Sequence, residues 1–124
     1  MNIVDSSGWL EFFADGPNAE FFAPVIQQPE ELIVPSITVY EVFKRVLQQK
    51  GESHALSAVA TMTQSTVVDL DTAIALNAAK ASVETKLPMA DSVILATARY
   101  CDAVLWTQDA DFEGMEGIRY VSGR

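Results

Sequence analysis

The sequence predicts one α/β domain in which helices cover both faces of a five-stranded, mainly parallel sheet, a three-layer α/β/α arrangement. Short apolar segments alternate with helical patterns along the 124 residues, and this alternation is typical of parallel strands joined by helices. No internal repeat or low-complexity linker divides the chain, and its length suffices for one compact core. Residues 1–124 are therefore expected to form a single domain.

Turn residues divide the first half of the chain into six elements. Asp15-Gly16-Pro17 forms a turn between the first two helices. A break at Gly51 separates two helices that follow the second strand directly, so this helical hairpin should protrude. The expected elements are strand 2–5, helices 7–14 and 18–28, strand 31–34, and helices 37–50 and 52–64.

The second half of the chain contains two further helices between its strands. Asp71 suits the N-cap of the first of them, and Pro88 lies just beyond that helix's end. Two short apolar segments near the C-terminus are expected to be strands. The expected elements are strand 66–70, helices 72–86 and 90–101, and strands 103–107 and 118–121.

The charge balance excludes one class of nucleic-acid-binding surface. Eight lysine and arginine residues stand against seventeen aspartate and glutamate residues, which gives a net charge of −9. Because nonspecific nucleic-acid affinity comes from basic surfaces, a broad phosphate-binding face is not expected. A polyanionic substrate would require bound metal ions or a few local cations.

The single cysteine and the hydropathy of the chain indicate a cytoplasmic protein. Cys101 cannot form an internal disulfide, and its place at the end of an apolar helix favours a buried packing thiol over a nucleophile. The N-terminus lacks the basic region of a signal peptide. No apolar run approaches the ~20 residues needed to cross a bilayer, so no membrane contact is expected.

Four acidic residues occur where strands end or where helices begin. Asp5 and Asp109 follow the first and fourth strands, while Glu41 and Asp91 lie early in helices. In a parallel α/β sheet these positions share one edge, which is where ligands bind. Converging carboxylates would repel one another unless a hard cation lay between them. The pattern therefore predicts a metal-dependent enzyme.

Each acid also has a purely structural interpretation. Asp5 suits an N-cap, and Glu41 forms the Ser/Thr-x-x-Glu capping-box pattern with Thr38. Asp91 would complement a helix dipole, and Asp109 would suit a turn. The structural interpretation is weakest for Asp91, because the residues that share its helix face are apolar: Ile94, Leu95 and Ala98.

Four sequence blocks carry a resemblance to a known family. They are Ile3-Val4-Asp5-Ser6-Ser7, segment 34–42 around Glu41, segment 87–98 around Asp91, and Thr107-Gln108-Asp109-Ala110-Asp111-Phe112. With these blocks in this order, the chain resembles the PIN-domain ribonucleases, most closely the VapC toxins of toxin–antitoxin modules. The resemblance implies an acidic metal site supported by two hydroxyls, and its residues are Asp5, Glu41, Asp91 and Asp109 with Ser7 and Thr107. Asp111 is an alternative fourth acid; Asp109, closer to the strand end, is favoured.

The donor set indicates the metal and the chemistry. An all-oxygen site favours Mg²⁺, with Mn²⁺ as a substitute, over zinc, and the only histidine, His54, lies in a polar stretch. The expected reaction is metal-assisted hydrolysis of RNA phosphodiester bonds. Asp5 and Asp91 are the expected direct ligands, whereas Glu41 and Asp109 would hold waters or orient the nucleophile.

Apolar residues beyond those that a core requires point to protein partners. Helix 37–50 carries a wide apolar arc that includes Tyr40 and Leu47. Together with Phe13 or Phe22, these side chains are expected to form an exposed patch. The family resemblance implies a homodimer and an antitoxin whose tail lies over the acidic site.

The roles of two cations and the choice among three functions each have alternatives. Lys44 and Arg45 stand three and four residues after Glu41, so they either pair with it on the helix surface or meet RNA phosphates or a partner's tail. One rival function is a catalytically inactive PIN-like module that only binds a partner. The other is a phosphotransfer receiver-like domain, which would require paired acids in the first loop and a lysine after a late strand.

Overall fold

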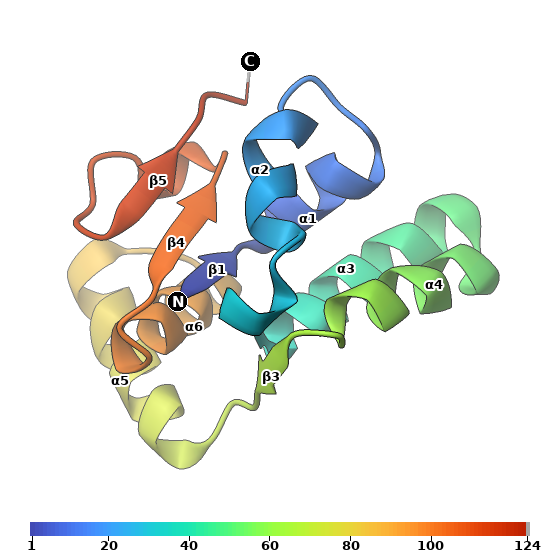
Figure 1. The fold of residues 1–124 in the computed structure, drawn as a ribbon. Coiled ribbons are helices and arrows are strands. Elements are labelled where there is room, and N and C mark those ends of the chain that lie inside the picture. Colours follow the sequence, from blue (N-terminus) through green and yellow to red (C-terminus); the bar gives the residue numbers. More distant parts are fainter. Residues whose placement is uncertain (124) are drawn as a thin grey trace.

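The computed structural model describes residues 1–123 of the chain. Five strands form one sheet in the order β3-β2-β1-β4-β5, and every neighbouring pair is parallel (Figure 1). The sheet confirms the predicted fold class, and it is parallel throughout rather than mainly so. The strands are β1 (Asn2–Val4), β2 (Leu32–Pro35), β3 (Thr66–Val68), β4 (Val104–Thr107) and β5 (Ile118–Tyr120).

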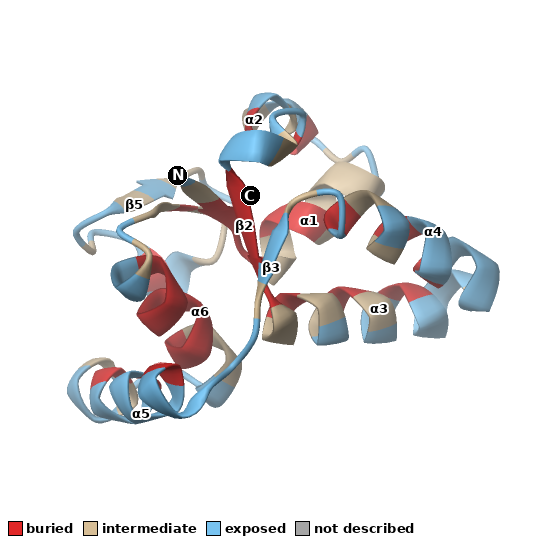
Figure 2. Ribbon diagram, turned by 60° about the horizontal axis from the view of Figure 1, so that its bottom comes forward, coloured by how far each residue is buried: buried red, intermediate tan, exposed pale blue. Residues whose placement is uncertain are grey.

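Helices cover the two faces of this sheet, and two apolar cores lie between the layers (Figure 2). On one face lie α1 (Ser6–Phe13), α2 (Ala19–Ile26), α3 (Ser36–Lys50) and α4 (Glu52–Met62). On the other lie α5 (Thr72–Thr85) and α6 (Met89–Tyr100). Two short 3-10 turns, η1 (Pro29–Glu31) and η2 (Ala110–Phe112), were not expected from the sequence.

The central strands supply side chains to both cores. On β2, Leu32 and Val34 belong to the core beneath α1–α4, whereas Ile33 belongs to the core beneath α5 and α6. On β1, Val4 and Ile3 divide in the same way. Successive side chains of a strand point to opposite faces, so an unbroken apolar run is what a strand covered on both sides requires.

Local signals set several element ends as predicted. The Asp71 side chain caps α5 by accepting a hydrogen bond from the Ile74 backbone N–H at 2.9 Å. Gly51 adopts a φ of 88° between α3 and α4, a backbone conformation that favours glycine. The two helices form a hairpin that extends away from the sheet (Figure 1). The predicted order of helices and strands is confirmed, and most ends differ by one or two residues.

The prediction that Phe13 or Phe22 contributes to an exposed patch is met only in part. Phe22 is fully buried in the core with Val4 and Trp9, whereas Phe13 is partly exposed. The reason lies at Gly8, where a Cβ atom would stand 2.7 Å from a Phe22 ring carbon. Glycine thus lets α1 and α2 approach closely enough to enclose Phe22.

The remaining expectations about single residues are met in part. Tyr40 and Leu47 are exposed, at 59% and 40%. Cys101 is only partly buried, although it packs against the core beneath α6. His54 is exposed on α4, as its polar surroundings predicted. Among residues 1–123, no helix is both long and apolar enough to cross a membrane.

Candidate metal centre

The candidate site lies where β1 and β4 run side by side. From β1 the chain continues to β2 and β3 on one side, while β4 and β5 add to the other side. This point is the topological switch of the sheet, and ligands of parallel α/β domains bind outside the strand ends there. Asp5 follows β1 directly, and its backbone N–H donates to the Trp106 carbonyl of β4 at 3.1 Å.

Asp5 is a buried carboxylate held by three donors. Its Oδ1 accepts from the Gly8 backbone N–H at 3.0 Å and the Ser7 hydroxyl at 2.8 Å, and its Oδ2 accepts from the Thr107 hydroxyl at 2.6 Å. Burial raises the pKa of Asp5 to about 6, although these hydrogen bonds oppose the rise. Asp5 therefore caps α1 and also contributes a carboxylate to the sheet edge.

Thr107 links Asp5 to the acids after β4. Its fully buried hydroxyl oxygen accepts from the Asp109 backbone N–H at 2.9 Å while donating to Asp5. Asp109 in turn caps η2, since its Oδ1 accepts from the Asp111 backbone N–H at 2.9 Å. The short 3-10 turn thereby presents both Asp109 and Asp111 at the same edge as Asp5.

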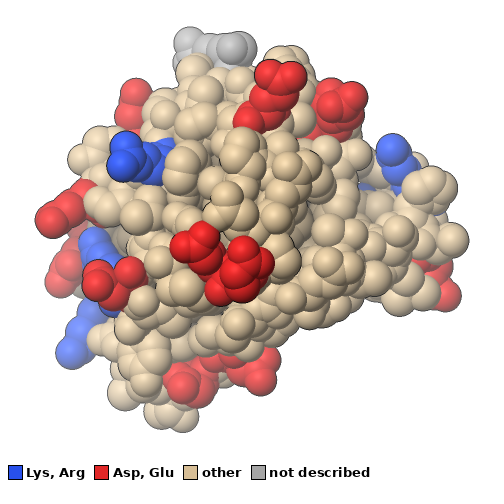
Figure 3. All heavy atoms as spheres, viewed as in Figure 1, with Lys and Arg blue, Asp and Glu red and all other residues tan. Residues whose placement is uncertain are grey.

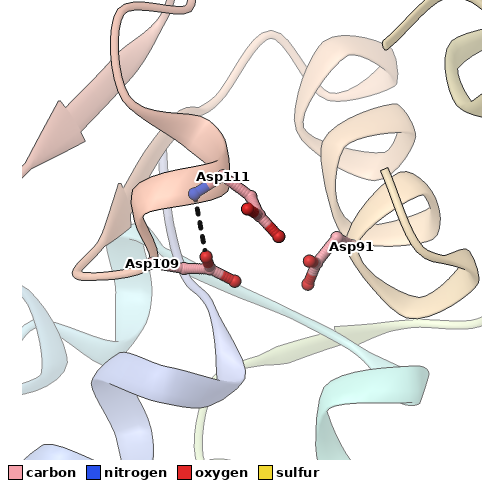
Figure 4. A group of neighbouring side chains, drawn as sticks. All are labelled: Asp91, Asp109 and Asp111. Atoms are coloured by element: carbon pink, nitrogen blue, oxygen red, sulfur yellow. Dashed lines mark hydrogen bonds between the residues drawn. The ribbon is translucent and has the colours of Figure 1, made fainter. Parts of the chain in front are cut away.

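Three carboxylates form the tightest acidic group in the described part of the chain. One oxygen from each of Asp91, Asp109 and Asp111 lies within 4.8 Å of the others (Figure 4). Asp91 comes from the first turn of α6, and the other two come from the β4–η2 segment. Two elements distant in sequence thus bring their carboxylates together.

The pKa of Asp91 reports the convergence of five acids. This pKa is raised to about 7, chiefly by burial and then by the charges of Asp109, Asp5, Glu41 and Asp111, in that order of effect. Asp91 itself is partly exposed, whereas Ile94 on the same helix face is fully buried. Asp91 therefore lies at the rim of the core, not within it.

Glu41 reaches the site from α3 through a partner that sequence reasoning missed. Its Oε1 accepts from the Ser6 hydroxyl at 2.5 Å. The capping-box interpretation is wrong, because α3 begins at Ser36 and Thr38 is already inside the helix. Within residues 1–123 the buried Thr38 hydroxyl has no hydrogen-bond partner. The available signal for Ser6 was its place directly after Asp5.

The donor chemistry fits a hard divalent cation. Every side chain in the group supplies oxygen, and two carboxyls, Asp5 and Asp91, have raised pKa values beside other acids. Mg²⁺ and Mn²⁺ bind carboxylate oxygens, whereas zinc sites usually include histidine or cysteine. His54 lies on α4, and Cys101 follows the far end of α6 from Asp91. The residues present therefore suit Mg²⁺ or Mn²⁺.

The structure defines a parallel α/β domain with a carboxylate cluster at the switch point of its sheet, and sequence comparison identifies its family. The family model described as "PIN domain" matches residues 3–118. The chain therefore belongs to the PIN domain family, which confirms the resemblance found in the sequence. Among curated proteins, none matches this sequence at a significant level.

Solved structures share the fold at low sequence identity. A toxin–antitoxin complex from Klebsiella pneumoniae contains a chain with a TM-score of 0.81 and 22% identity, with 96% of each chain covered. The DNA-bound VapBC of Salmonella typhimurium has a TM-score of 0.74 and 20% identity, covering 98% of each chain. VapC20 of Mycobacterium tuberculosis, described as a sarcin-ricin loop cleaving toxin, has a TM-score of 0.71 and 17% identity, covering 91% of this chain and 92% of that one.

Proposed function

We propose that this protein is a Mg²⁺-dependent endoribonuclease that hydrolyses RNA phosphodiester bonds and acts as the toxin of a toxin–antitoxin module. The observation that carries the proposal is the convergence of five carboxylates, from β1, α3, α6 and the β4–η2 segment, at the switch point of a PIN-family domain. The structural likeness to VapC chains supports the same class of activity.

The hydrogen bonds of the site indicate which carboxylates would hold the cation. Asp5 Oδ1 already accepts two hydrogen bonds and Oδ2 accepts one, so a single lone pair of Oδ2 remains for a metal. Asp109 has one oxygen engaged by Asp111 and one available. Asp91 accepts no hydrogen bond from the rest of residues 1–123. We assign Asp91, Asp5 and Asp109 as the metal-holding residues, with Asp111 beside them.

The chain's own residues would position the cation and the reacting water. When bound, the divalent cation supplies positive charge that polarises the phosphodiester and eases deprotonation of the attacking water. Ser7 and Thr107 hold Asp5 in one orientation. Glu41, fixed by Ser6, is the carboxylate we assign to orient the water and accept its proton.

The proposal predicts that cleavage of RNA depends on a divalent cation. Purified protein should cut RNA into fragments in Mg²⁺ or Mn²⁺, and EDTA should reduce the rate at least ~100-fold, because removing the cation removes its stabilisation of the transition state. Gel electrophoresis of the products measures this. If the protein binds Mn²⁺ yet cleaves no RNA, the activity is absent and the inactive partner-binding module becomes the correct interpretation.

An apolar groove on the α3–α4 hairpin supports the proposed homodimer. Its volume is about 560 Å³, and its walls include Val39, Phe43 and Val59. Tyr40 and Leu47 stand exposed at its margin. A second copy of the same face would cover this groove across a two-fold axis. The antitoxin is proposed to place a segment along α3 and a cation at the acids, where the cation would replace the metal's charge.

A charge in this groove should therefore break the dimer. Tyr40→Glu with Leu47→Glu would bury two unpaired carboxylates at the interface, so the protein should become monomeric with little loss of folding stability. Light scattering at micromolar concentration measures the mass. Leu76→Glu with Val83→Glu is the matched control, because both side chains are exposed on α5, at 63% and 75%, in the opposite helical layer. A monomeric wild-type protein, or equal disruption by this control, would contradict the assignment.

A further inference from the structure

A second groove lies between α1, α3 and α4 and opens beside the acidic site. Its volume is about 620 Å³, and Leu10, Phe13 and Val46 give it apolar walls. Ser7 and Gln108 line the same groove. Since the Ser7 hydroxyl donates to Asp5, one end of the groove adjoins the carboxylate cluster. The groove is therefore continuous with the proposed metal centre.

Positive charge gathers along this groove although the chain is strongly acidic. Arg45 and Lys50 line it, and Glu11 is the only acid among the lining residues. The Glu11 carboxylate is engaged at the α1–α2 turn, where its Oε2 accepts from the Asn18 backbone N–H at 2.7 Å. Figure 3 shows basic atoms over the hairpin on a face where acidic groups prevail.

The cations of the groove are not used within the chain. Glu41, the one acid on α3, accepts a hydrogen bond from Ser6 instead. In the described chain neither Arg45 nor Lys50 pairs with an acid. Of the two alternatives for Arg45, pairing with Glu41 is not observed in the described residues, so Arg45 remains available to an anion.

We propose that this groove binds the backbone of a single-stranded segment of the RNA substrate as it leaves the acidic site, with Arg45 and Lys50 contacting its phosphates. The inference rests on the proposed ribonuclease function. With a helical rise of 1.5 Å per residue, Arg45 lies about 6 Å and Lys50 about 14 Å along α3 from Glu41. Two cations are thus spaced along one path away from the acids. The apolar walls suit unstacked bases.

The charge pattern suits a polyanion as occupant of the groove, and the antitoxin segment proposed to lie along α3 would compete with it. A single-stranded RNA presents regularly spaced phosphates and bases with apolar faces, which match the separated cations and the walls lined by Leu10 and Phe13. With a net charge of −9, the protein would repel RNA wherever such cations are missing. These residues would therefore determine how tightly substrate binds more than how fast it reacts.

The test compares two double variants with the same change of charge. Arg45→Gln with Lys50→Gln removes the cations of the groove, and Lys80→Gln with Lys86→Gln removes two from the α5 region. Binding of a fluorescein-labelled single-stranded RNA is measured by anisotropy in Ca²⁺ buffer, and its cleavage in Mg²⁺ gives kcat and KM. The groove variant should weaken binding and raise KM by roughly 10- to 100-fold, with kcat within a few-fold of wild type.

Two further readouts separate the proposal from its alternatives. The slope of log affinity against log salt should fall by about 1.4 in the groove variant, and the loss of affinity should be smaller for a dinucleotide substrate, which is too short to reach Lys50. Equal losses in both double variants, or an unchanged groove variant, would overturn the proposal. Unchanged RNA binding with weakened antitoxin binding would assign the groove to protein instead. If wild-type protein neither binds nor cleaves RNA, the proposed function itself fails.

Discussion

Replacing Asp91 by asparagine should abolish RNA cleavage while the protein still folds. The substitution keeps the size of the side chain but removes the carboxylate on which the charges of four other acids act. Loss of a direct metal-holding group should lower kcat by at least ~100-fold. Asp5→Asn should act as strongly. Cleavage rates with saturating Mg²⁺ and circular dichroism of the same preparations measure activity and folding separately.

The same assay distinguishes the two candidates for the fourth acid. The Asp109 backbone N–H donates to the Thr107 hydroxyl, and the Asp109 side chain accepts from the Asp111 backbone N–H. The Asp111 side chain, by contrast, is exposed. Asp109→Asn should therefore reduce activity more than Asp111→Asn. The opposite order would make Asp111 the metal-holding residue and leave the rest of the site unchanged. Full activity of Asp91→Asn would contradict the metal centre as a whole.

Residues whose role depends on nearby sequence could be predicted, and Asp5 is the clearest case. It follows an apolar run and precedes a helix, so both its N-cap role and its place at a strand end follow from local pattern. The alternation of Leu32, Ile33 and Val34 between the two cores follows from the two-residue period of a strand. The order of helices and strands along the chain was predictable because apolar segments alternate with helical patterns.

Features that depend on distant contacts were missed. The bond between Ser6 and Glu41 joins residues 35 positions apart, and no local rule pairs them. Thr38 was assigned to a capping box because the pattern fits, but β2 runs to Pro35 and α3 starts at once, which places Thr38 inside the helix. The burial of Phe22 depends on the close approach at Gly8, and such packing is decided by tertiary contacts.

The accumulation of acids at the switch point should cost stability when no cation is present. Asp5 is 2% exposed, and burying a carboxylate disfavours its charged form. Asp91 adds repulsion from four neighbours. A group of this kind has no advantage for folding alone, so its presence supports a role in binding a cation.

Without divalent cations, the protein should become less stable as the pH rises. The pKa of Asp5 is raised from 3.8 to about 6 and that of Asp91 from 3.8 to about 7 in the folded protein. Between pH 3.8 and about pH 7 the folded state binds more protons than the unfolded chain, so the free energy of unfolding falls with increasing pH. The stabilising effect is complete below the unfolded value near 3.8 and lost once the pH exceeds about 7. In EDTA, the Tm should fall by roughly 5–10 °C between pH 5 and pH 8.

Adding Mn²⁺ at pH 8 should reverse this loss, because only the folded state assembles the site and a ligand of the folded state raises the Tm. A rise of roughly 5–10 °C at saturating Mn²⁺ is expected. Asp91→Asn is the control: it relieves repulsion, so at pH 8 in EDTA it should be at least as stable as wild type, with a weaker pH dependence and little response to Mn²⁺. Differential scanning calorimetry measures the Tm of wild type and of Asp91→Asn in EDTA at pH 5 and pH 8, and with Mn²⁺ at pH 8. A wild-type Tm that ignores both pH and Mn²⁺ would show that these carboxylates neither repel one another nor share a cation.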